Sequence, residues 1–189
     1  MDDTQNASGT VINSWRVHQE LLSTKQKARQ VLRDACVRAL SFGKVIENTG
    51  NWIRFPYYHH VFEDERTGFE RQMKYLLGKG DMLSLDDVVE LLNSDSEIPG
   101  RFFCITFDDG LRCCYDHAFP ILSELGIPSA FFVVTAYTAE SATERVVRPL
   151  HGKSRYCFEY LTWPECREMV EQGMTIGSHT RDHARLGDL

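Results

Sequence analysis

Short apolar runs that alternate with amphipathic segments limit the folds open to this chain more than any other feature. Residues 101–107 and 129–135 have the length and the near-continuous apolar character of strands buried on both faces. Helical patterns occur around these runs, and Gly126 and Gly173 mark two of the helix ends. Strands that alternate with helices predict a parallel sheet covered by helices. The sequence therefore predicts an α/β fold, either a barrel or an open sheet.

Two pairs of residues have the spacing of a capping box, a motif that opens helices. Ser84 with Asp87 predicts one helix, and Thr162 with Glu165 predicts another. Asp86 and Asp87 then fall in the first turn of a helix, where carboxylates interact favourably with the helix dipole. We therefore interpret this acidic pair as structural.

The first fifty residues form a separate part of the predicted organisation. We divide the chain into 1–50, a tail with an amphipathic helix, and 51–189, the α/β domain. Apolar residues at helical spacing predict one leading helix from about 15 to 42. This helix can pack on the domain, join a partner or lie on a membrane surface, and we expect packing. Residues 52–58 then predict a first strand.

The charge and the distribution of apolar residues argue against several classes of protein. The chain carries 21 Lys and Arg against 27 Asp and Glu, a net charge of −6, whereas binders of nucleic acid need a basic face. No apolar run reaches the ~18 residues of a membrane span, and the polar start carries no secretion signal. We expect no nucleic-acid partner, no transmembrane segment and a cytoplasmic location. The six cysteines form no Cys-x-x-Cys pair and are expected to be reduced, buried thiols.

Residues suited to chemistry cluster at two strand ends. Asp108 and Asp109 directly follow the strand that ends at residue 107, and His179 and His183 follow a last short strand. In α/β folds these strand ends form the working face. Adjacent carboxylates repel unless a cation holds one of them, and histidines four residues apart have a common metal-ligand spacing. Two imidazoles and one carboxylate leave open positions on a divalent metal.

These two clusters resemble the first two motifs of the polysaccharide deacetylase family, also called the NodB-homology or carbohydrate esterase family 4 group. Three further stretches are similar to the family, so the likeness covers roughly residues 53–189. The matching segments are Tyr58-His59-His60-Val61, Thr106-Phe107-Asp108-Asp109-Gly110, residues 125–133, Leu161-Thr162-Trp163 and, about 70 residues after the acidic pair, residues 177–183.

The resemblance implies a distorted (β/α) barrel of about seven strands, rather than the eight of the regular barrel. It also implies that Asp108 is the general base and that Asp109, His179 and His183 hold a divalent metal. The metal would be zinc, with cobalt and nickel as alternatives, and Thr180 would stabilise the histidine loop. The implied activity is hydrolysis of N- or O-acetyl groups, and the implied partner is an acetylated polysaccharide or other acetylated sugar.

The later family motifs, including the Leu-x-His that supplies the general acid, do not occur in this sequence. Only three or four barrel strands can be counted, so we expect a partial barrel, truncated after the second motif. Its open sheet edge would permit self-association. One alternative is a non-catalytic relative that binds metal or sugar and associates with a partner chain. Another is an iron oxygenase with two histidines and one carboxylate, although the order of the ligands disfavours it.

Three smaller features have less specific interpretations. His59 and His60 follow the first strand and either line the cleft or pack structurally. Cys113 and Cys114 are interpreted as buried helix residues rather than metal ligands. Residues 145–155 contain five basic side chains, Arg145, Arg148, His151, Lys153 and Arg155. We interpret them as a solvated loop, with contact to an anionic saccharide as the alternative.

Overall fold

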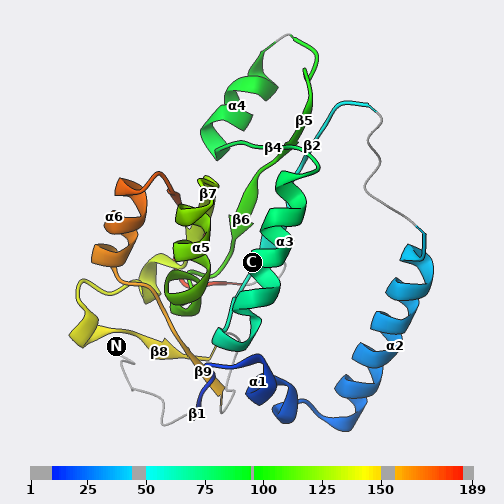
Figure 1. The fold of residues 1–189 in the computed structure, drawn as a ribbon. Helices are drawn as coiled ribbons and strands as arrows, with labels where there is room; N and C mark the ends of the chain where they lie inside the picture. The colour runs from blue at the N-terminus through cyan, green and yellow to red at the C-terminus, as the bar shows by residue number, and fades with distance from the viewer. Residues whose placement is uncertain (1–9, 44–49, 95, 150–155, 185–189) are drawn as a thin grey trace.

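The computed structural model describes residues 10–43, 50–94, 96–149 and 156–184 (Figure 1). Its centre is a four-stranded sheet in the order β10-β7-β6-β3, in which every neighbouring pair is parallel. The four strands are β3 (Tyr57–Tyr58), β6 (Ile105–Phe107), β7 (Ser129–Val133) and β10 (Thr175–Ser178). The predicted parallel α/β architecture is therefore confirmed.

A second parallel sheet has the order β2-β5-β4, with β2 at Trp52–Arg54, β4 at Asp81–Met82 and β5 at Arg101–Phe103. The strand expected at 129–135 is confirmed as β7, but the strands expected at 52–58 and 101–107 are each two short strands that belong to different sheets. The expectation of a single strand was wrong for these two segments because Pro56 has no N–H for the ladder, and the segment 52–58 bends there. The neighbouring segment follows the bend, since Cys104 donates to the Arg54 carbonyl at 3.0 Å and Thr106 to the Pro56 carbonyl at 3.1 Å.

A third sheet has the order β1-β9-β8 and was not expected from the sequence. It consists of β1 (Thr10–Val11), β8 (Val147–Arg148) and β9 (Tyr156–Glu159), and only the β8–β9 pair is antiparallel. Across the described ranges, no strand pairing joins the three sheets into a closed barrel.

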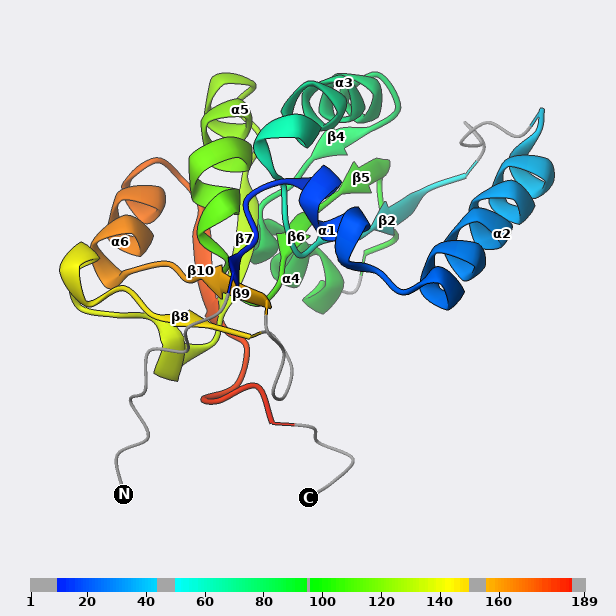
Figure 2. The same ribbon diagram turned by 90° about the horizontal axis from the view of Figure 1, so that it is seen from below.

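Four helices pack around the strands, and Figure 2 shows α3, α5 and α6 beside the central sheet. They are α3 (Arg66–Leu77), α4 (Leu85–Asn93), α5 (Phe119–Glu124) and α6 (Trp163–Glu171). Both predicted capping boxes are present, at the starts of α4 and α6. A π-helical turn, η2 (Cys114–Ala118), precedes α5, and short 3-10 turns are found at η1 (Glu63–Glu65), η3 (Thr135–Tyr137) and η4 (Ala142–Glu144).

The main core lies between the central sheet and α3, α5 and α6. Phe107 and Phe131 stack at its centre with ring centroids 4.4 Å apart, and both are 1% exposed. Burial of an aromatic side chain of this size stabilises the fold by about 1.5–3 kcal/mol. The stacked rings belong to β6 and β7, and Phe107 is the last residue of β6. Packing of the two rings therefore fixes the strand end that the acidic pair directly follows.

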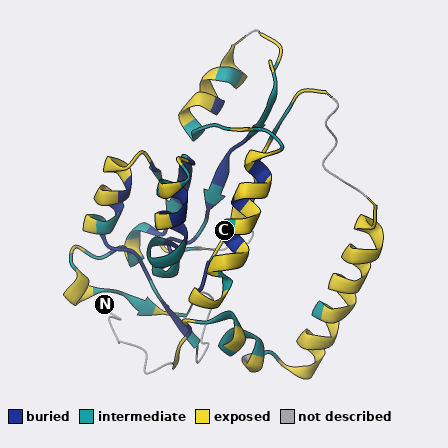
Figure 3. Cartoon of the chain, viewed as in Figure 1, coloured by how far each residue is buried: buried dark blue, intermediate teal, exposed yellow. Residues whose placement is uncertain are grey.

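The leading helix differs from the expectation in two ways. It is divided into α1 (Trp15–Leu21) and α2 (Thr24–Ser41), because Ser23 forms a new capping box with Gln26. Asp64 anchors α1 by accepting hydrogen bonds from the Ser14 hydroxyl and from the first two backbone N–H groups of the helix. By contrast, α2 extends away from the sheets and is exposed along its length (Figures 1 and 3). The expectation that the whole helix packs on the domain was therefore wrong for α2.

The cysteines follow the expected pattern in part. All six are free, and four are buried. Cys36 is exposed on α2 and Cys113 is half-buried, which corrects the expectation that every thiol is buried. In the part of the chain that the structure describes, no helix has the length and apolar character that a bilayer crossing requires.

Candidate metal centre

The sheet topology brings the two predicted clusters to one edge. Strands β6 and β10 both pair with β7 and run in the same direction, so their carboxyl ends lie side by side. The Asp108 N–H donates to the Tyr58 carbonyl at 2.9 Å, and the His179 N–H donates to the Val133 carbonyl at 2.8 Å. These bonds extend the strand pairing into the site and fix the start of each loop.

Asp109, His179 and His183 come together at this edge. The Asp109 Oδ1 atom lies 3.4 Å from Nε2 of His179 and 3.2 Å from Nε2 of His183. One ligand atom from each of the three residues lies within 4.8 Å of the others. Asp109 is 1% exposed, whereas both histidines are partly exposed. The three side chains thus face a common point. Asp109 approaches it from the buried interior, and the two histidines approach it from partly exposed positions.

This donor set fits a divalent cation. Among the described residues, Oδ1 of Asp109 accepts no hydrogen bond, and a buried polar atom without a partner is unfavourable by about 1–3 kcal/mol. A bound cation would compensate this atom directly. Two imidazoles and one carboxylate are donors typical of zinc and of neighbouring transition metals, and they leave open positions for water and substrate.

The backbone of both loops is strained where the ligands project. In the described segments, the non-glycine residues with positive φ are Asp109 at 71°, Thr180 at 63° and His183 at 56°. Such residues concentrate at functional sites, where surrounding structure holds them in place. Here the Thr180 hydroxyl accepts a hydrogen bond from the His183 N–H at 3.0 Å. This contact agrees with the role that the resemblance gives to Thr180.

Gly110 makes a close approach possible directly behind the acidic pair. Its φ is 69°, and a Cβ placed on it would lie 3.0 Å from the Cα, Cβ and Cγ1 atoms of Val133. Any other residue would strain the backbone at this φ, and its Cβ would force Val133 to shift by a few tenths of an ångström. Asp108 is half-buried at the start of this loop. Its role as general base stays a prediction.

The structure places the two candidate histidines of the first strand differently. Nδ1 of His60 lies 3.0 Å from Oε2 of Glu65, and its ring stacks on Phe62 and Trp15 at centroid distances of 4.6 and 5.5 Å. His60 is therefore a packing residue beneath α1. His59 is exposed, and its carbonyl accepts a hydrogen bond from the Cys114 thiol. Burial raises the pKa of that thiol, which agrees with the interpretation of Cys114 as an unreactive core residue.

The predicted basic loop is only partly solvated. Arg145 forms a largely buried ion pair with Glu165, and the Arg148 guanidinium lies 4.8 Å from the centre of the Tyr137 ring. The interpretation as solvated was therefore wrong for Arg145, whose ion-pair partner the sequence does not reveal, whereas Arg148 is exposed as expected. The other basic residues of this stretch, His151, Lys153 and Arg155, lie outside the described residues.

The comparisons with known proteins define the class. A family model described as polysaccharide deacetylase matches residues 95–189, half of the chain. The chain belongs to the polysaccharide deacetylase family.

Particular relatives agree with this assignment. YxkH of Bacillus subtilis (strain 168), a relative named for the same family, is 29% identical over 143 residues, which are 75% of this chain and 42% of YxkH. The structure of IcaB from Ammonifex degensii is 27% identical with a TM-score of 0.58, covering 71% of this chain and 55% of IcaB. A de-N-acetylase from Aggregatibacter actinomycetemcomitans shares the fold with a TM-score of 0.58 at 21% identity, covering 68% of this chain and 55% of that protein. The chain thus spans 42–55% of the length of these relatives.

Proposed function

We propose that this chain is a metal-dependent hydrolase that removes acetyl groups from a polysaccharide or another acetylated sugar. The observation that carries the proposal is the convergence of Asp109, His179 and His183 on one point. The buried Oδ1 atom of Asp109 accepts no hydrogen bond from any described residue. Membership of the polysaccharide deacetylase family supports the reaction class. The proposed metal is zinc, and cobalt and nickel suit the same donors.

The residues of the site have two roles: some would hold the metal ion, and one would accept the proton of the attacking water. A divalent ion held by Asp109, His179 and His183 would polarise the acetyl carbonyl and lower the pKa of a bound water. Asp108 precedes the buried ligand in the chain, and we assign to it the removal of the proton from the attacking water. Thr180 holds the loop between the two histidines through its hydrogen bond to His183. A backbone N–H near the site would stabilise the oxyanion that forms.

Release of acetate tests this proposal. Protein loaded with Zn²⁺ is expected to release acetate from N-acetylglucosamine oligomers or from an O-acetylated polysaccharide, and a chelator is expected to stop the reaction until Zn²⁺ is added back. Asp108→Asn should retain the metal and lose turnover by at least about 100-fold, the lower range for a general base. Acetate release that survives chelation, or that Asp108→Asn leaves unchanged, would contradict the proposal.

A second candidate function is a non-catalytic relative that binds metal or sugar and associates with a partner chain. The three separate sheets favour it, because sheet edges without a neighbour present unpaired backbone groups to another chain. Protein that is folded and binds Zn²⁺, but releases no acetate and sediments as an oligomer, would support this candidate. The iron-oxygenase alternative is not favoured, since the ligands lie on a parallel α/β sheet.

A further inference from the structure

The loop that carries Asp109 is held by a second segment from outside the central sheet. The Gly110 carbonyl accepts a hydrogen bond from the Leu161 N–H at 2.9 Å. The neighbouring residues, Leu111 and Tyr160, form an isolated antiparallel bridge. Leu111, Tyr160 and Leu161 are each at most 1% exposed. The left-handed turn at Asp109 and Gly110 thus depends on the position of residues 160–161.

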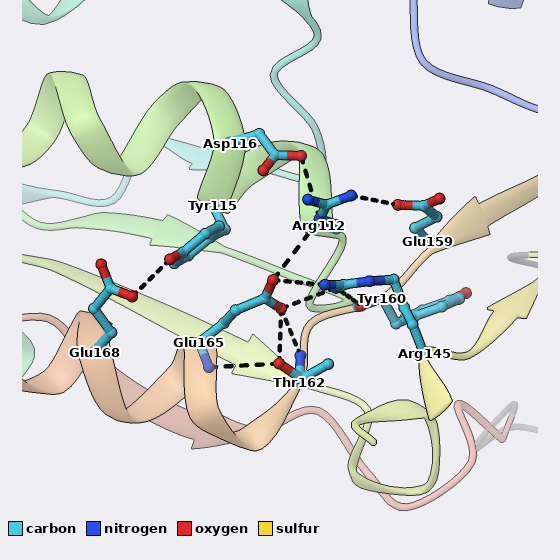
Figure 4. Close-up of polar contacts among 9 residues, drawn as sticks. All are labelled: Arg112, Tyr115, Asp116, Arg145, Glu159, Tyr160, Thr162, Glu165 and Glu168. Atoms are coloured by element: carbon cyan, nitrogen blue, oxygen red, sulfur yellow. Dashed lines mark hydrogen bonds and ion pairs between the residues drawn. The ribbon is translucent and has the colours of Figure 1, made fainter. Parts of the chain in front are cut away.

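Arg145 and Glu165 fix residues 160–161 in turn (Figure 4). The Arg145 guanidinium donates to the Tyr160 carbonyl at 2.9 Å and to both carboxylate oxygens of Glu165 at 2.9 and 2.7 Å. The same carboxylate accepts a hydrogen bond from the Thr162 N–H at 2.9 Å. The backbone on both sides of Leu161 is therefore bonded to one ion pair.

The burial of this ion pair indicates a geometric rather than a stabilising role. The side chains of Arg145 and Glu165 are only 11% and 13% exposed. Burial alone would raise the pKa of Glu165, but the hydrogen bonds from Arg145 and Thr162 hold it below its ordinary value. Replacing a buried ion pair by apolar residues is often neutral for stability. Its bidentate geometry, however, fixes direction as well as distance.

A second arginine reaches Glu165 from the side of the metal loop (Figure 4). Arg112 lies two residues after Gly110, and its Nε atom is 3.7 Å from Oε1 of Glu165. The same guanidinium pairs with Glu159 at 2.9 Å and with Asp116 at 3.4 Å. Glu165 thus lies between two arginines, Arg145 and Arg112. It belongs to α6, the helix that immediately precedes β10 and the histidine loop.

We propose that the Arg145–Glu165 ion pair positions the metal loop: it holds residues 160–161 so that Asp109 keeps its left-handed conformation and faces the two histidines. Both are positioning residues, because they act through Leu161 and the Gly110 carbonyl. This inference rests on the metal site of the proposed function.

Glu165→Gln and Arg145→Met test the inference, and Asp87→Asn is the matched control. Asp87 occupies in α4 the capping-box position that Glu165 occupies in α6, but it pairs with no arginine among the residues that the structure describes. Glu165→Gln keeps the size of the side chain and an oxygen that can accept a hydrogen bond from Thr162, so it is the less disruptive of the two variants. Two measurements are needed: hydrogen–deuterium exchange of residues 108–111 and 161 in metal-free protein, and Co²⁺ affinity with the visible absorption spectrum of the Co²⁺-loaded protein.

We expect Glu165→Gln and Arg145→Met to accelerate exchange at residues 108–111 and 161. Both variants should also weaken Co²⁺ binding by about 10-fold and change the Co²⁺ spectrum, because loss of residues that orient metal ligands has effects of this size. Asp87→Asn should match the parent in both measurements. Exchange and Co²⁺ affinity that stay at parent values in Glu165→Gln would overturn the inference. If the parent itself binds no Co²⁺, the proposed function fails, while exchange in metal-free protein still decides whether the ion pair positions the loop.

Discussion

The dipeptide Asp-Asp occurs twice in this chain, in two contrasting environments. Asp86 and Asp87 lie exposed in the first turn of α4, where Asp87 accepts hydrogen bonds from the backbone N–H and the hydroxyl of Ser84. Asp108 and Asp109 follow β6, and Asp109 is 1% exposed with a φ of 71°. One carboxylate of the first pair completes a local helix cap. The buried carboxylate of the second pair faces two histidines that are 70 and 74 residues away in the sequence.

The difference shows that the element before an acidic pair decides what the pair can do. At a helix start, free N–H groups and water satisfy the carboxylates at once. At the end of a buried strand, free N–H groups and water do not reach the carboxylate in this way. Its partners are instead the histidines that follow another strand of the sheet. The first arrangement is complete with four residues of chain, whereas the second requires the whole sheet.

The largest expected contrast between the two pairs is in metal binding. Asp109→Ala should abolish tight binding of Zn²⁺ or Co²⁺, by more than the 10–100-fold that outer-shell changes produce, because it removes the buried ligand. His179→Ala should have the same effect. Asp86→Ala removes an equal charge and should leave the affinity unchanged in a calorimetric titration. Retention of tight binding by Asp109→Ala and His179→Ala would show that the ion is held elsewhere.

The backbone next to each site gives a second, smaller contrast. Gly110 and Gly126 both have positive φ, but a Cβ on Gly126 would meet nothing within 4 Å, while one on Gly110 would lie 3.0 Å from Val133. Gly126→Ala should therefore reduce the free energy of unfolding only by the strain of the conformation, about 1 kcal/mol. Gly110→Ala adds overpacking against β7, for a total of about 3 kcal/mol. Urea denaturation measures both, and equal losses would mean that Val133 moves aside at little energy.

Features that depend on neighbouring residues alone were predicted well from the sequence. The two capping boxes are local hydrogen-bond motifs, so Ser84 and Thr162 marked the starts of α4 and α6 correctly. The parallel sheet followed from apolar runs of strand length. Both clusters of the candidate site were also visible, because strand ends in parallel sheets meet at one edge.

Features set by distant partners could not be predicted in this way. Arg145 lies in a polar stretch typical of a solvated loop, yet its partner Glu165 is twenty residues further on, and both side chains are largely buried. Strands β1 and β8 contain two residues each and carry no periodic signal. The exposure of α2 could not be predicted either. An amphipathic pattern indicates that one face of a helix can be buried, but it does not identify the element that buries it.

The smallest expected contrast lies within the exposed acidic pair itself. Asp87 accepts hydrogen bonds from Ser84, whereas Asp86, which forms no hydrogen bond with another described side chain, contributes through its charge near the positive end of the helix dipole. Asp87→Ala should therefore reduce the free energy of unfolding by about 1 kcal/mol, and Asp86→Ala by about 0.3 kcal/mol. Salt should diminish the effect of Asp86→Ala and leave most of the effect of Asp87→Ala, because screening weakens charge–dipole attraction more than a hydrogen bond. Thermal unfolding at low and high salt separates the two. Equal losses that vanish together in salt would show that α4 uses both carboxylates only as charges, and that the capping box contributes nothing of its own.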